Sequence, residues 1–503
     1  MTTTSPPTTD FDVVIIGAGI SGIGAACHLA TRRPGTSFAI LEGRDEVGGT
    51  WSLFRYPGIR SDSDMPTYGY GFKPWTHRKS IADGHLILDY LRETAAEHGL
   101  DAHIRFGHRV IGAQFSSATG RWTVTARRAD GAAARFTARF LLLGTGIYDH
   151  ERGFTPEFAG IEDFRGRVVH PQQWPRDLDY TGKRVVVIGS GATAVTLLPS
   201  MADTAAHVTM LQRSPSYVFS LPAEDVIANA LNAVFGHERA ARLVRWKNIA
   251  FTRAIFKACQ RFPRTARKVL IAAVRRQLPP HFDVDTHFTP RYNPWEQRLC
   301  IVPNGDLFKA ISTGRASVVT DRIERFTGNG ILLESGRELA ADIVVTATGF
   351  TMSPFGKIGF EVDGRAVSLP ETTVHKSTML SGVPNLVFVI GYTNISWTLK
   401  VDLVGEYFCR LLDFMDSRGY RTVEPTLSDP RMNRVPLVHD LTSGYVQRGI
   451  AAFPRAGTED PWTAEMAYES DLDRLRNAAI DDPALKFGTG TSTAAALVEE
   501  LAR

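Results

Sequence analysis

The chain has 503 residues, of which 43% are hydrophobic and 22% are charged, a globular composition that excludes disordered and collagen-like chains. This length corresponds to roughly two to four domains and excludes a small binding module. No run of about 18 apolar residues predicts a membrane span, and residues 1–10 lack the pattern of a signal peptide. We therefore expect a cytoplasmic protein.

The cysteines are scattered and form no CxxC pair. They are Cys27, Cys259, Cys300 and Cys409. This spacing argues against a disulfide framework, a zinc site and a dithiol oxidoreductase. We expect four small buried side chains and predict no metal site.

The first predicted unit is a strand, a turn and a helix. Residues 11–16 form a short apolar run typical of a buried parallel strand, residues 20–30 are helical in pattern, and residues 37–41 predict the next strand. The motif Gly17-Ala18-Gly19-Ile20-Ser21-Gly22 joins strand to helix, where glycines admit a pyrophosphate to the helix N-terminus. Glu42 ends the second strand, where a carboxylate accepts ribose hydroxyls and repels a 2′-phosphate. The unit predicts FAD or NAD binding, and a glycine turn without ligand is the alternative.

Two glycine triplets follow later strands. Three strands are predicted within residues 107–143, and the last of them ends at Gly144-Thr145-Gly146. Another strand, over residues 342–346, ends at Ala347-Thr348-Gly349. Glycine at such a place marks a strand that leaves the sheet near a ligand, so we expect each triplet to close one nucleotide-binding domain.

A second strand-turn-helix unit begins at residue 184. Its strands are predicted over residues 184–188 and 207–211, and its turn is Gly189-Ser190-Gly191-Ala192-Thr193-Ala194, in which Ala replaces the third glycine, an allowed variant. No acid ends the second strand; Arg213 and Ser214 stand there and match a 2′-phosphate by charge and hydrogen bonding. The unit predicts NADPH binding, and an incidental surface arginine is the alternative.

Residues 222–280 are strongly basic, with twelve Lys or Arg against three Asp or Glu, although the whole chain has a net charge of only +4. The pattern over residues 223–277 is helical. We expect an apolar stripe from Leu243, Val244, Ile249, Ile255, Phe256, Val269, Leu270 and Ile271. A helical insertion with a solvated basic face is the favoured interpretation; peripheral contact with a membrane surface or an anionic partner is the alternative. Nucleic-acid binding is not expected, since no recognised module accompanies the charge.

These patterns predict an α/β protein with two Rossmann-like nucleotide-binding domains and a helical insertion in the second. We expect residues 1–150 and 350–503 to form the FAD domain, residues 151–222 and 296–349 the NADPH domain, and residues 223–295 the insertion. Two sites of opposite ribose chemistry predict a flavoprotein that accepts hydride from NADPH and passes electrons to O2 or another diffusible acceptor.

Two longer patterns carry a resemblance to a known family. Residues 164–175 fit FxGxxxHxxxWP through Phe164, Gly166, His170, Trp174 and Pro175, just before the second glycine motif. Residues 49–62 fit GxWxxxx[FY]P[GM]xxxD. The chain thereby resembles type I Baeyer–Villiger flavin monooxygenases, and is most similar to the subgroup of the ethionamide-activating monooxygenase. Flavin monooxygenases without Baeyer–Villiger activity resemble it too, but usually lack the Trp-Pro ending.

The resemblance implies a reaction. In the family, reduced flavin and O2 form a C4a-peroxide that attacks a ketone to give an ester or lactone, or oxidises a thioether or thioamide to its S-oxide. Arg298 corresponds to the family's catalytic arginine, and Asp62 to the carboxylate that orients it. The substrates would be a small ketone or sulfur compound and O2. The alternatives are N- or S-oxygenation without Baeyer–Villiger activity and, more remotely, a membrane-surface flavoprotein without turnover.

The resemblance also implies cofactor contacts. Those to FAD are Gly17, Gly19, Ser21, Gly22, Glu42, Gly49, Thr50, Trp51, Asp62, Tyr68 and Val110. Those to NADPH are Arg60, Ser61, Asp62, Gly189, Ser190, Gly191, Ala192, Thr193, Ala194, Val195, Arg213 and Ser214. His170 and Trp174 are assigned to the linker between domains. The chain departs from the family pattern in two places. Gln297 replaces the usual Lys before the catalytic arginine. The C-terminal SWYxG stretch is missing, and Ser443-Gly444-Tyr445 is the most similar segment.

Overall fold

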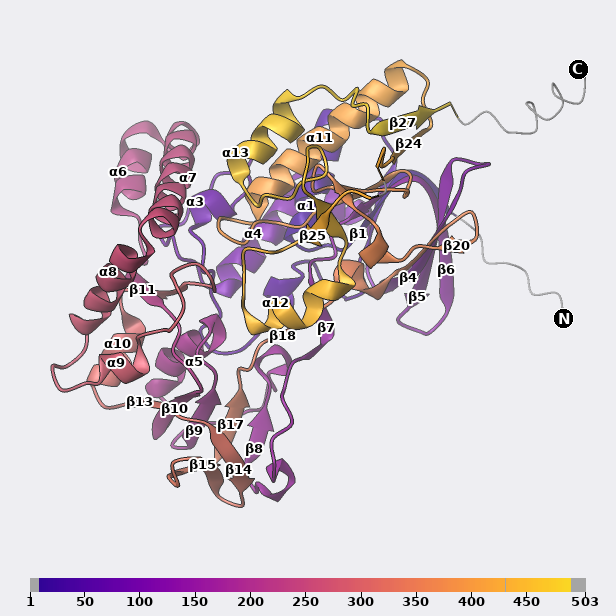
Figure 1. The fold of residues 1–503 in the computed structure, drawn as a ribbon. Helices are drawn as coiled ribbons and strands as arrows, with labels where there is room; N and C mark the ends of the chain where they lie inside the picture. Colours follow the sequence, from indigo (N-terminus) through magenta and orange to yellow (C-terminus); the bar gives the residue numbers. More distant parts are fainter. Residues whose placement is uncertain (1–8, 430, 490–503) are drawn as a thin grey trace, which may run out of the picture.

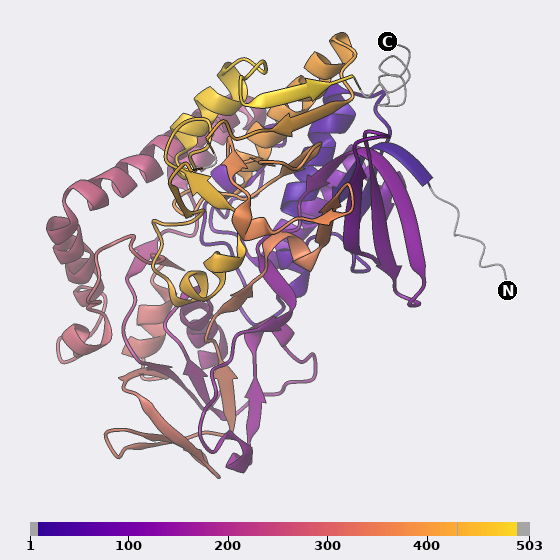
Figure 2. The same cartoon turned by 45° about the vertical axis from the view of Figure 1, so that its right-hand side comes forward.

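The chain folds around two separate β-sheets, which confirms the predicted α/β class. The computed structural model describes residues 9–429 and 431–489. Figure 1 shows the first sheet and its helices in the upper right of the molecule, the second sheet below, and the helices of residues 226–275 along the left edge. Figure 2, turned by 45°, shows the same separation of the two sheets.

The first sheet has nine strands and combines a parallel with an antiparallel part. Its order is β20-β19-β4-β5-β6-β1-β2-β3, and β23 pairs with the end of β6. Strands β23, β6, β1, β2 and β3 run parallel, whereas β4, β5 and β6 form an antiparallel meander. Their bounds are Thr9–Ile16 (β1), Phe38–Leu41 (β2), Ile104–Arg105 (β3), His108–Ser116 (β4), Arg121–Arg128 (β5), Ala133–Leu143 (β6), Gly359–Val362 (β19), Arg365–Ala366 (β20) and Leu386–Phe388 (β23).

Strand β1 lies at the centre of the parallel part. Its last four residues are fully buried, as expected for a strand covered on both faces. Helix α1 (Ile20–Arg32) follows it and packs against the long helix α11 (Thr398–Ser417). The first and last quarters of the chain therefore share one core.

The second sheet has five parallel strands in the order β13-β10-β9-β17-β8. Helix α5 (Ala192–Ala202) and helix α10 (Asp306–Ser312) pack together beside it. The strand bounds are Arg167–Val169 (β8), Arg184–Ile188 (β9), His207–Gln212 (β10), Ala316–Thr320 (β13) and Ile343–Thr346 (β17).

The two places where the chain was expected to cross between domains lie side by side. Strand β7 (Tyr148–Gly153) pairs antiparallel with β18 (Phe350–Met352). The two glycine triplets that precede these strands therefore face the same region. The other small strands are Val218–Leu221 (β11), Cys300–Pro303 (β12), Ile323–Thr327 (β14), Gly330–Leu333 (β15), Glu338–Ala340 (β16), Val374–His375 (β21), Met379–Leu380 (β22), Thr422–Pro425 (β24), Arg434–Pro436 (β25), Arg455–Gly457 (β26) and Leu485–Gly488 (β27).

The basic segment is helical, as predicted, but the prediction of its buried apolar stripe was partly wrong. It forms α6 (Val226–Phe235), α7 (His237–Arg261) and α8 (Pro263–Arg275). Val244 and Leu270 are buried, whereas Leu243 and Val269 are 57% and 62% exposed. These helices have apolar residues on more than one side, so periodicity does not reveal which side is covered.

Within the described residues, no helix is long and apolar enough to cross a bilayer. The remaining α-helices are Thr50–Leu53 (α2), Met65–Tyr68 (α3), Gly84–Glu97 (α4), Val284–His287 (α9), Gly444–Gly449 (α12) and Tyr468–Asp471 (α13).

The substitution Gly22→Ala should destabilise the first unit. A Cβ atom on Gly22 would lie 1.8 Å from the carbonyl oxygen of Gly17, whose own φ is +100°. Because backbone cannot move aside cheaply, we expect a loss of about 1–3 kcal/mol in the free energy of unfolding, with reduced FAD content, measured by denaturant unfolding and flavin absorbance. Gly35→Ala is the control, since its Cβ would meet nothing within 4 Å. Equal stability of the two variants would contradict the tight packing at Gly22.

Candidate active site

A cavity of about 1170 Å³ lies between the two sheets, and both glycine motifs line it. Its volume exceeds the roughly 300–1000 Å³ of ordinary ligand pockets. It reaches from the turn after β1 to the turn after β9, and the segments that follow both glycine triplets also contribute to its wall. The space and its position at the carboxyl ends of the parallel strands of both sheets suit two extended nucleotides.

Glu42 is fixed at the end of β2 beside the first glycine turn. Its Oε2 accepts a hydrogen bond from the backbone N–H of Ala18 at 2.7 Å, and its Oε1 accepts one from the N–H of Arg44 at 2.9 Å. The side chain is only 7% exposed, yet it lines the cavity. A carboxylate held in this way keeps lone pairs free, so the ribose contact predicted from the sequence is sterically and chemically possible.

Ten of the eleven residues predicted to contact FAD line the cavity. The exception is Gly22, which packs against the turn instead. Trp51 Nε1 donates a hydrogen bond to the hydroxyl of Tyr68 at 3.0 Å, and Trp397 Nε1 donates one to Ser21 Oγ at 2.8 Å. The ten are Gly17, Gly19, Ser21, Glu42, Gly49, Thr50, Trp51, Asp62, Tyr68 and Val110.

The second glycine turn is hydrogen-bonded to the loop that carries Arg213. A Cβ atom on Gly189, whose φ is +139°, would lie 2.3 Å from the carbonyl oxygen of Ala347. The hydroxyl of Ser190 donates to the carbonyl oxygen of Ser214 at 3.0 Å and ties this turn to the loop after β10. Arg213 is exposed and has no hydrogen bond or ion pair within the described residues. It is therefore free to bind a phosphate.

The other predicted NADPH contacts are divided between the cavity and the interior. Ala194 and Val195 are buried in the helix and do not line the cavity. Arg60 is paired with Asp306, but its buried Nη2 has no hydrogen-bond partner among the described residues. That unpaired donor in the cavity wall is consistent with a ligand contact. The residues that do line the cavity are Arg60, Ser61, Asp62, Gly189, Ser190, Gly191, Ala192, Thr193, Arg213 and Ser214.

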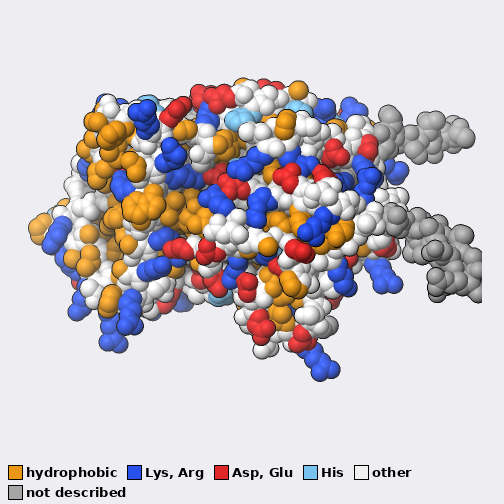
Figure 3. Space-filling view, turned by 90° about the horizontal axis from the view of Figure 1, so that it is seen from above, with side chains coloured by type: hydrophobic (Ala, Val, Ile, Leu, Met, Phe, Trp, Pro, Cys, Tyr) orange, Lys and Arg blue, Asp and Glu red, His pale blue; other side chains and the backbone are white. Residues whose placement is uncertain are grey.

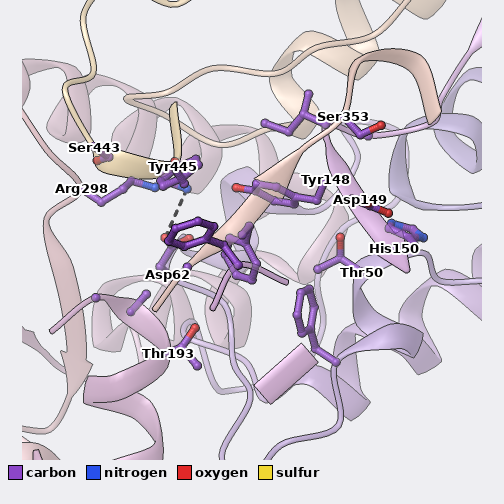
Figure 4. A pocket seen from close by; sticks show the side chains of 18 of the residues that line it. Thr50, Asp62, Tyr148, Asp149, His150, Thr193, Arg298, Ser353, Ser443 and Tyr445 are labelled. Atoms are coloured by element: carbon purple, nitrogen blue, oxygen red, sulfur yellow. Dashed lines mark ion pairs between the residues drawn. The ribbon is translucent and has the colours of Figure 1, made fainter. Parts of the chain in front are cut away.

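Arg298 and Asp62, which lie 236 positions apart in the sequence, form an ion pair inside the cavity (Figure 4). Arg298 Nη2 lies 3.3 Å from Asp62 Oδ2, and Nη1 donates to the carbonyl oxygen of Thr393 at 3.1 Å. Asp62 raises the pKa of the Arg298 guanidinium above its usual range and outweighs the opposing effect of burial. The guanidinium is therefore permanently charged, and its side chain leaves 41% of its surface open to the cavity.

Aromatic side chains beside this pair were not predicted from the sequence. Tyr148 lies 4.6 Å from Phe350 and 6.2 Å from Tyr445 between ring centroids, and all three line the cavity. Figure 4 shows Tyr445 beside Arg298 and Tyr148 farther along the same cavity. The sequence did contain a pattern that could have identified two of them: Tyr148 and Phe350 each follow a glycine triplet that marks a strand leaving the sheet near a ligand. Tyr445 belongs to the Ser443-Gly444-Tyr445 stretch.

The loop before α12 is tied to the loop that carries Arg298. Both the backbone N–H and the hydroxyl of Thr442 donate to the carbonyl oxygen of Glu296, at 2.8 and 2.9 Å. This contact sets Tyr445 against the cation. Cys300 also lines the cavity, but burial raises the pKa of its thiol to about 12, so the thiol is neutral and is not a nucleophile.

The segment containing residues 164–175 does not reach the cavity. None of Phe164, Gly166, His170, Trp174 and Pro175 lines it. Nε2 of His170 lies 3.3 Å from the carbonyl oxygen of Gly349, at the second crossing between the sheets, and burial lowers the pKa of His170. A neutral histidine at this point suits a linker that connects the two sheets.

Comparison with known families and sequences places this geometry among flavin enzymes. The flavin-binding monooxygenase-like family model matches residues 76–363, and an NAD(P)-binding Rossmann-like domain model matches residues 15–78. The FAD-containing monooxygenase EthA of Mycobacterium tuberculosis strain H37Rv is 52% identical over 481 residues, which are 95% of this chain and 98% of that protein. The probable FAD-binding monooxygenase AlmA of Acinetobacter baylyi is 45% identical over 483 residues, with coverages of 96% and 97%.

Solved structures show the same arrangement of sheets. An oxidized steroid monooxygenase bound to NADP superimposes with a TM-score of 0.70 at 26% identity, over 83% of this chain and 88% of that chain. An open crystal structure of cyclohexanone monooxygenase has a TM-score of 0.70 at 22% identity, over 83% and 90% of the two chains, and shares the fold.

Proposed function

Because the chain belongs to the flavin-binding monooxygenase-like family, we propose that it inserts oxygen beside a ketone carbonyl to give an ester or lactone, and oxidises thioethers or thioamides to S-oxides. It is a flavin-dependent oxidoreductase, and its cofactors are FAD and NADPH. The observation that carries the proposal is the Asp62–Arg298 pair, which faces the cavity shared by both glycine turns.

The residues of the cavity fit both cofactors. Glu42 and the turn around Gly17 would hold the adenosine and pyrophosphate of FAD, and Arg213 would bind the 2′-phosphate of NADPH. Bound FAD supplies hydride acceptance from NADPH and oxygen transfer from O2. In the overall reaction, ketone, O2, NADPH and a proton yield ester, NADP+ and water, so that one oxygen atom enters the product.

Arg298 stabilises negative charge that develops on oxygen during the transfer. It presents a fixed cation whose orientation is set by Asp62 and by the carbonyl of Thr393, so no reorganisation is needed when charge appears. Tyr148, Phe350 and Tyr445 form an apolar wall beside it. This wall excludes water and accepts an apolar substrate next to the cation.

A decisive experiment supplies the purified, FAD-loaded protein with NADPH, ¹⁸O2 and either a cyclic ketone or an aryl methyl thioether. We expect one labelled oxygen atom in the lactone and in the S-oxide, detected by mass spectrometry. Labelled S-oxide without any ester from a panel of ketones would favour the alternative, a heteroatom monooxygenase without Baeyer–Villiger activity. Hydrogen peroxide as the only oxygen product would refute both.

The substitution Arg213→Ala should weaken the binding of NADPH but not the binding of NADH. Loss of a charged hydrogen-bond donor to the 2′-phosphate costs about 1.5–3 kcal/mol, so the KM for NADPH should rise about 10- to 100-fold. The KM for NADH should stay almost constant, since NADH has no 2′-phosphate. Arg325→Ala, at an exposed arginine outside the cavity, is the control. An equal rise in KM for both nucleotides would show that Arg213 does not bind the 2′-phosphate.

A further inference from the structure

Helices α6–α8 present large apolar side chains to solvent. Trp246 is 71% exposed, and Phe251 and Leu243 are each 57% exposed. Among the described residues, thirteen large hydrophobic side chains are exposed, and nine of them belong to this segment. Single exposed hydrophobic residues are normal, but such a concentration marks an interaction surface. The other six are Val226, Ile227, Val234, Phe235, Phe262 and Val269.

The exposed apolar residues of α7 follow the helical repeat. Leu243, Trp246, Ala250 and Ala254 are spaced three or four residues apart and are all exposed. The opposite side packs against α3 and α6 and buries Val244 and other residues. In a surface helix of a soluble protein the outward stripe is usually polar, so the apolar outward stripe of α7 is suited to contact with a partner surface.

Unpaired cations lie on the same helices, α7 and α8, as the exposed apolar side chains. Arg245, Lys247, Arg253, Lys257 and Arg275 are held in ion pairs. Seven further cations have neither a hydrogen bond nor an ion pair within the described part of the chain: Arg239, Arg242, Arg261, Arg264, Arg267, Lys268 and Arg276. Figure 3 shows hydrophobic side chains mixed with Lys and Arg at the left end of the molecule, over these helices.

We propose that the outer face of α6–α8 docks on an anionic membrane surface. Apolar side chains enter the boundary between headgroups and acyl chains, while the cations face lipid phosphates, as in interfacial amphipathic helices. A second copy of the chain is disfavoured as occupant, because the same unpaired cations would meet each other. The proposal is independent of the oxygenation chemistry and is tested by binding alone.

Docking through α7 would fix the orientation of the whole enzyme. Arg245 Nη2 lies 2.8 Å from Asp402 of α11, and its Nη1 donates to the carbonyl oxygen of Gly69 at 2.7 Å. Phe256 contacts Trp295, three residues before Arg298, with ring centroids 5.5 Å apart. The helix is therefore held against the body of the protein beside the loop that carries Arg298.

The experiment is flotation of the FAD-loaded protein with vesicles of equal parts phosphatidylcholine and phosphatidylglycerol, compared with pure phosphatidylcholine. We expect binding to the mixed vesicles, weakened by salt. The double variant Arg239→Gln/Arg242→Gln should bind roughly thirtyfold more weakly, at about 1 kcal/mol for each cation near the surface. Trp246→Ser/Phe251→Ser should weaken binding on the order of tenfold or more.

Matched controls keep the test specific. Arg325→Gln removes an exposed arginine of β14, and Ile111→Ser removes an exposed hydrophobic residue of β4. Figure 1 shows both strands away from α6–α8. Both should bind like the unaltered protein, and all variants should retain FAD. Absence of flotation, or equal binding to both vesicle types, would overturn the proposal. So would an oligomer in lipid-free solution that dissociates in Trp246→Ser/Phe251→Ser, because a second copy would then cover this face.

Discussion

Replacing Arg298 with alanine should stop oxygen transfer while leaving the reduction of FAD by NADPH measurable. The guanidinium is the permanent cation that Asp62 holds in the cavity wall. Removal of one such electrostatic contact costs about 10²- to 10³-fold in rate, and more is expected when a full charge is lost. Flavin reduction under anaerobic conditions and labelled product formation under ¹⁸O2, measured on the same preparation, separate the two half-reactions.

Two further variants sharpen this prediction. Asp62→Asn keeps the size of the side chain but removes the charge that orients Arg298, so it should lower oxygenation less than Arg298→Ala and increase peroxide release. Arg325→Ala serves again as the control for the loss of an arginine. Unchanged ester and S-oxide yields in Arg298→Ala would show that Arg298 is not a catalytic residue.

Replacing Glu42 with alanine should give a protein that loses FAD during gel filtration. Its carboxylate accepts hydrogen bonds from the buried N–H of Ala18 and the partly buried N–H of Arg44, and each buried group left unsatisfied costs about 1–3 kcal/mol. The ribose acceptor disappears at the same time, so both the folded turn and the cofactor lose a partner. We expect little bound FAD, read from the ratio of flavin to protein absorbance, and a lower midpoint of thermal unfolding.

Glu46→Ala provides a matched control four residues further on. Glu46 is paired with Arg55 and Arg92 at the surface and does not line the cavity. Exposed ion pairs contribute about 0–1 kcal/mol, so this variant should keep its FAD. Glu42→Gln fills the same space and tests the carboxylate itself. Full flavin retention in both Glu42 variants would contradict the ribose contact.

The two predicted glycine units match the structure closely. Strand β9 spans the predicted residues, and β1 begins two residues before the predicted start. These elements are specified locally: a run of apolar residues, a glycine turn and a helical repeat follow one another within about 30 residues. The predicted identity of the two nucleotides rests on Glu42 and Arg213, because the charge at the end of the second strand is expected to select the ribose.

The insertion shows where local pattern fails. Leu243 and Val269 have the spacing of buried residues, yet both are exposed. A helix with apolar residues on several sides is oriented by its neighbours. Here the ion pairs of Arg245 and Arg253 with Asp402 and Glu469 hold α7 on the body of the protein. Their partners are more than 150 residues away, so no window of sequence contains this information.

By itself, the sequence determined the α/β class, the two nucleotide motifs and, through two long patterns, the family resemblance that singled out Arg298 and Asp62. The resemblance also implied that Asp62 orients Arg298 and that His170 belongs to a linker. Only the tertiary structure showed the distance and geometry of the Asp62–Arg298 pair and placed Tyr148, Phe350 and Tyr445 in the same cavity. Strands and turns depend on neighbours along the chain, whereas a site assembled from residues 62, 148, 298 and 445 depends on how the sheets pack.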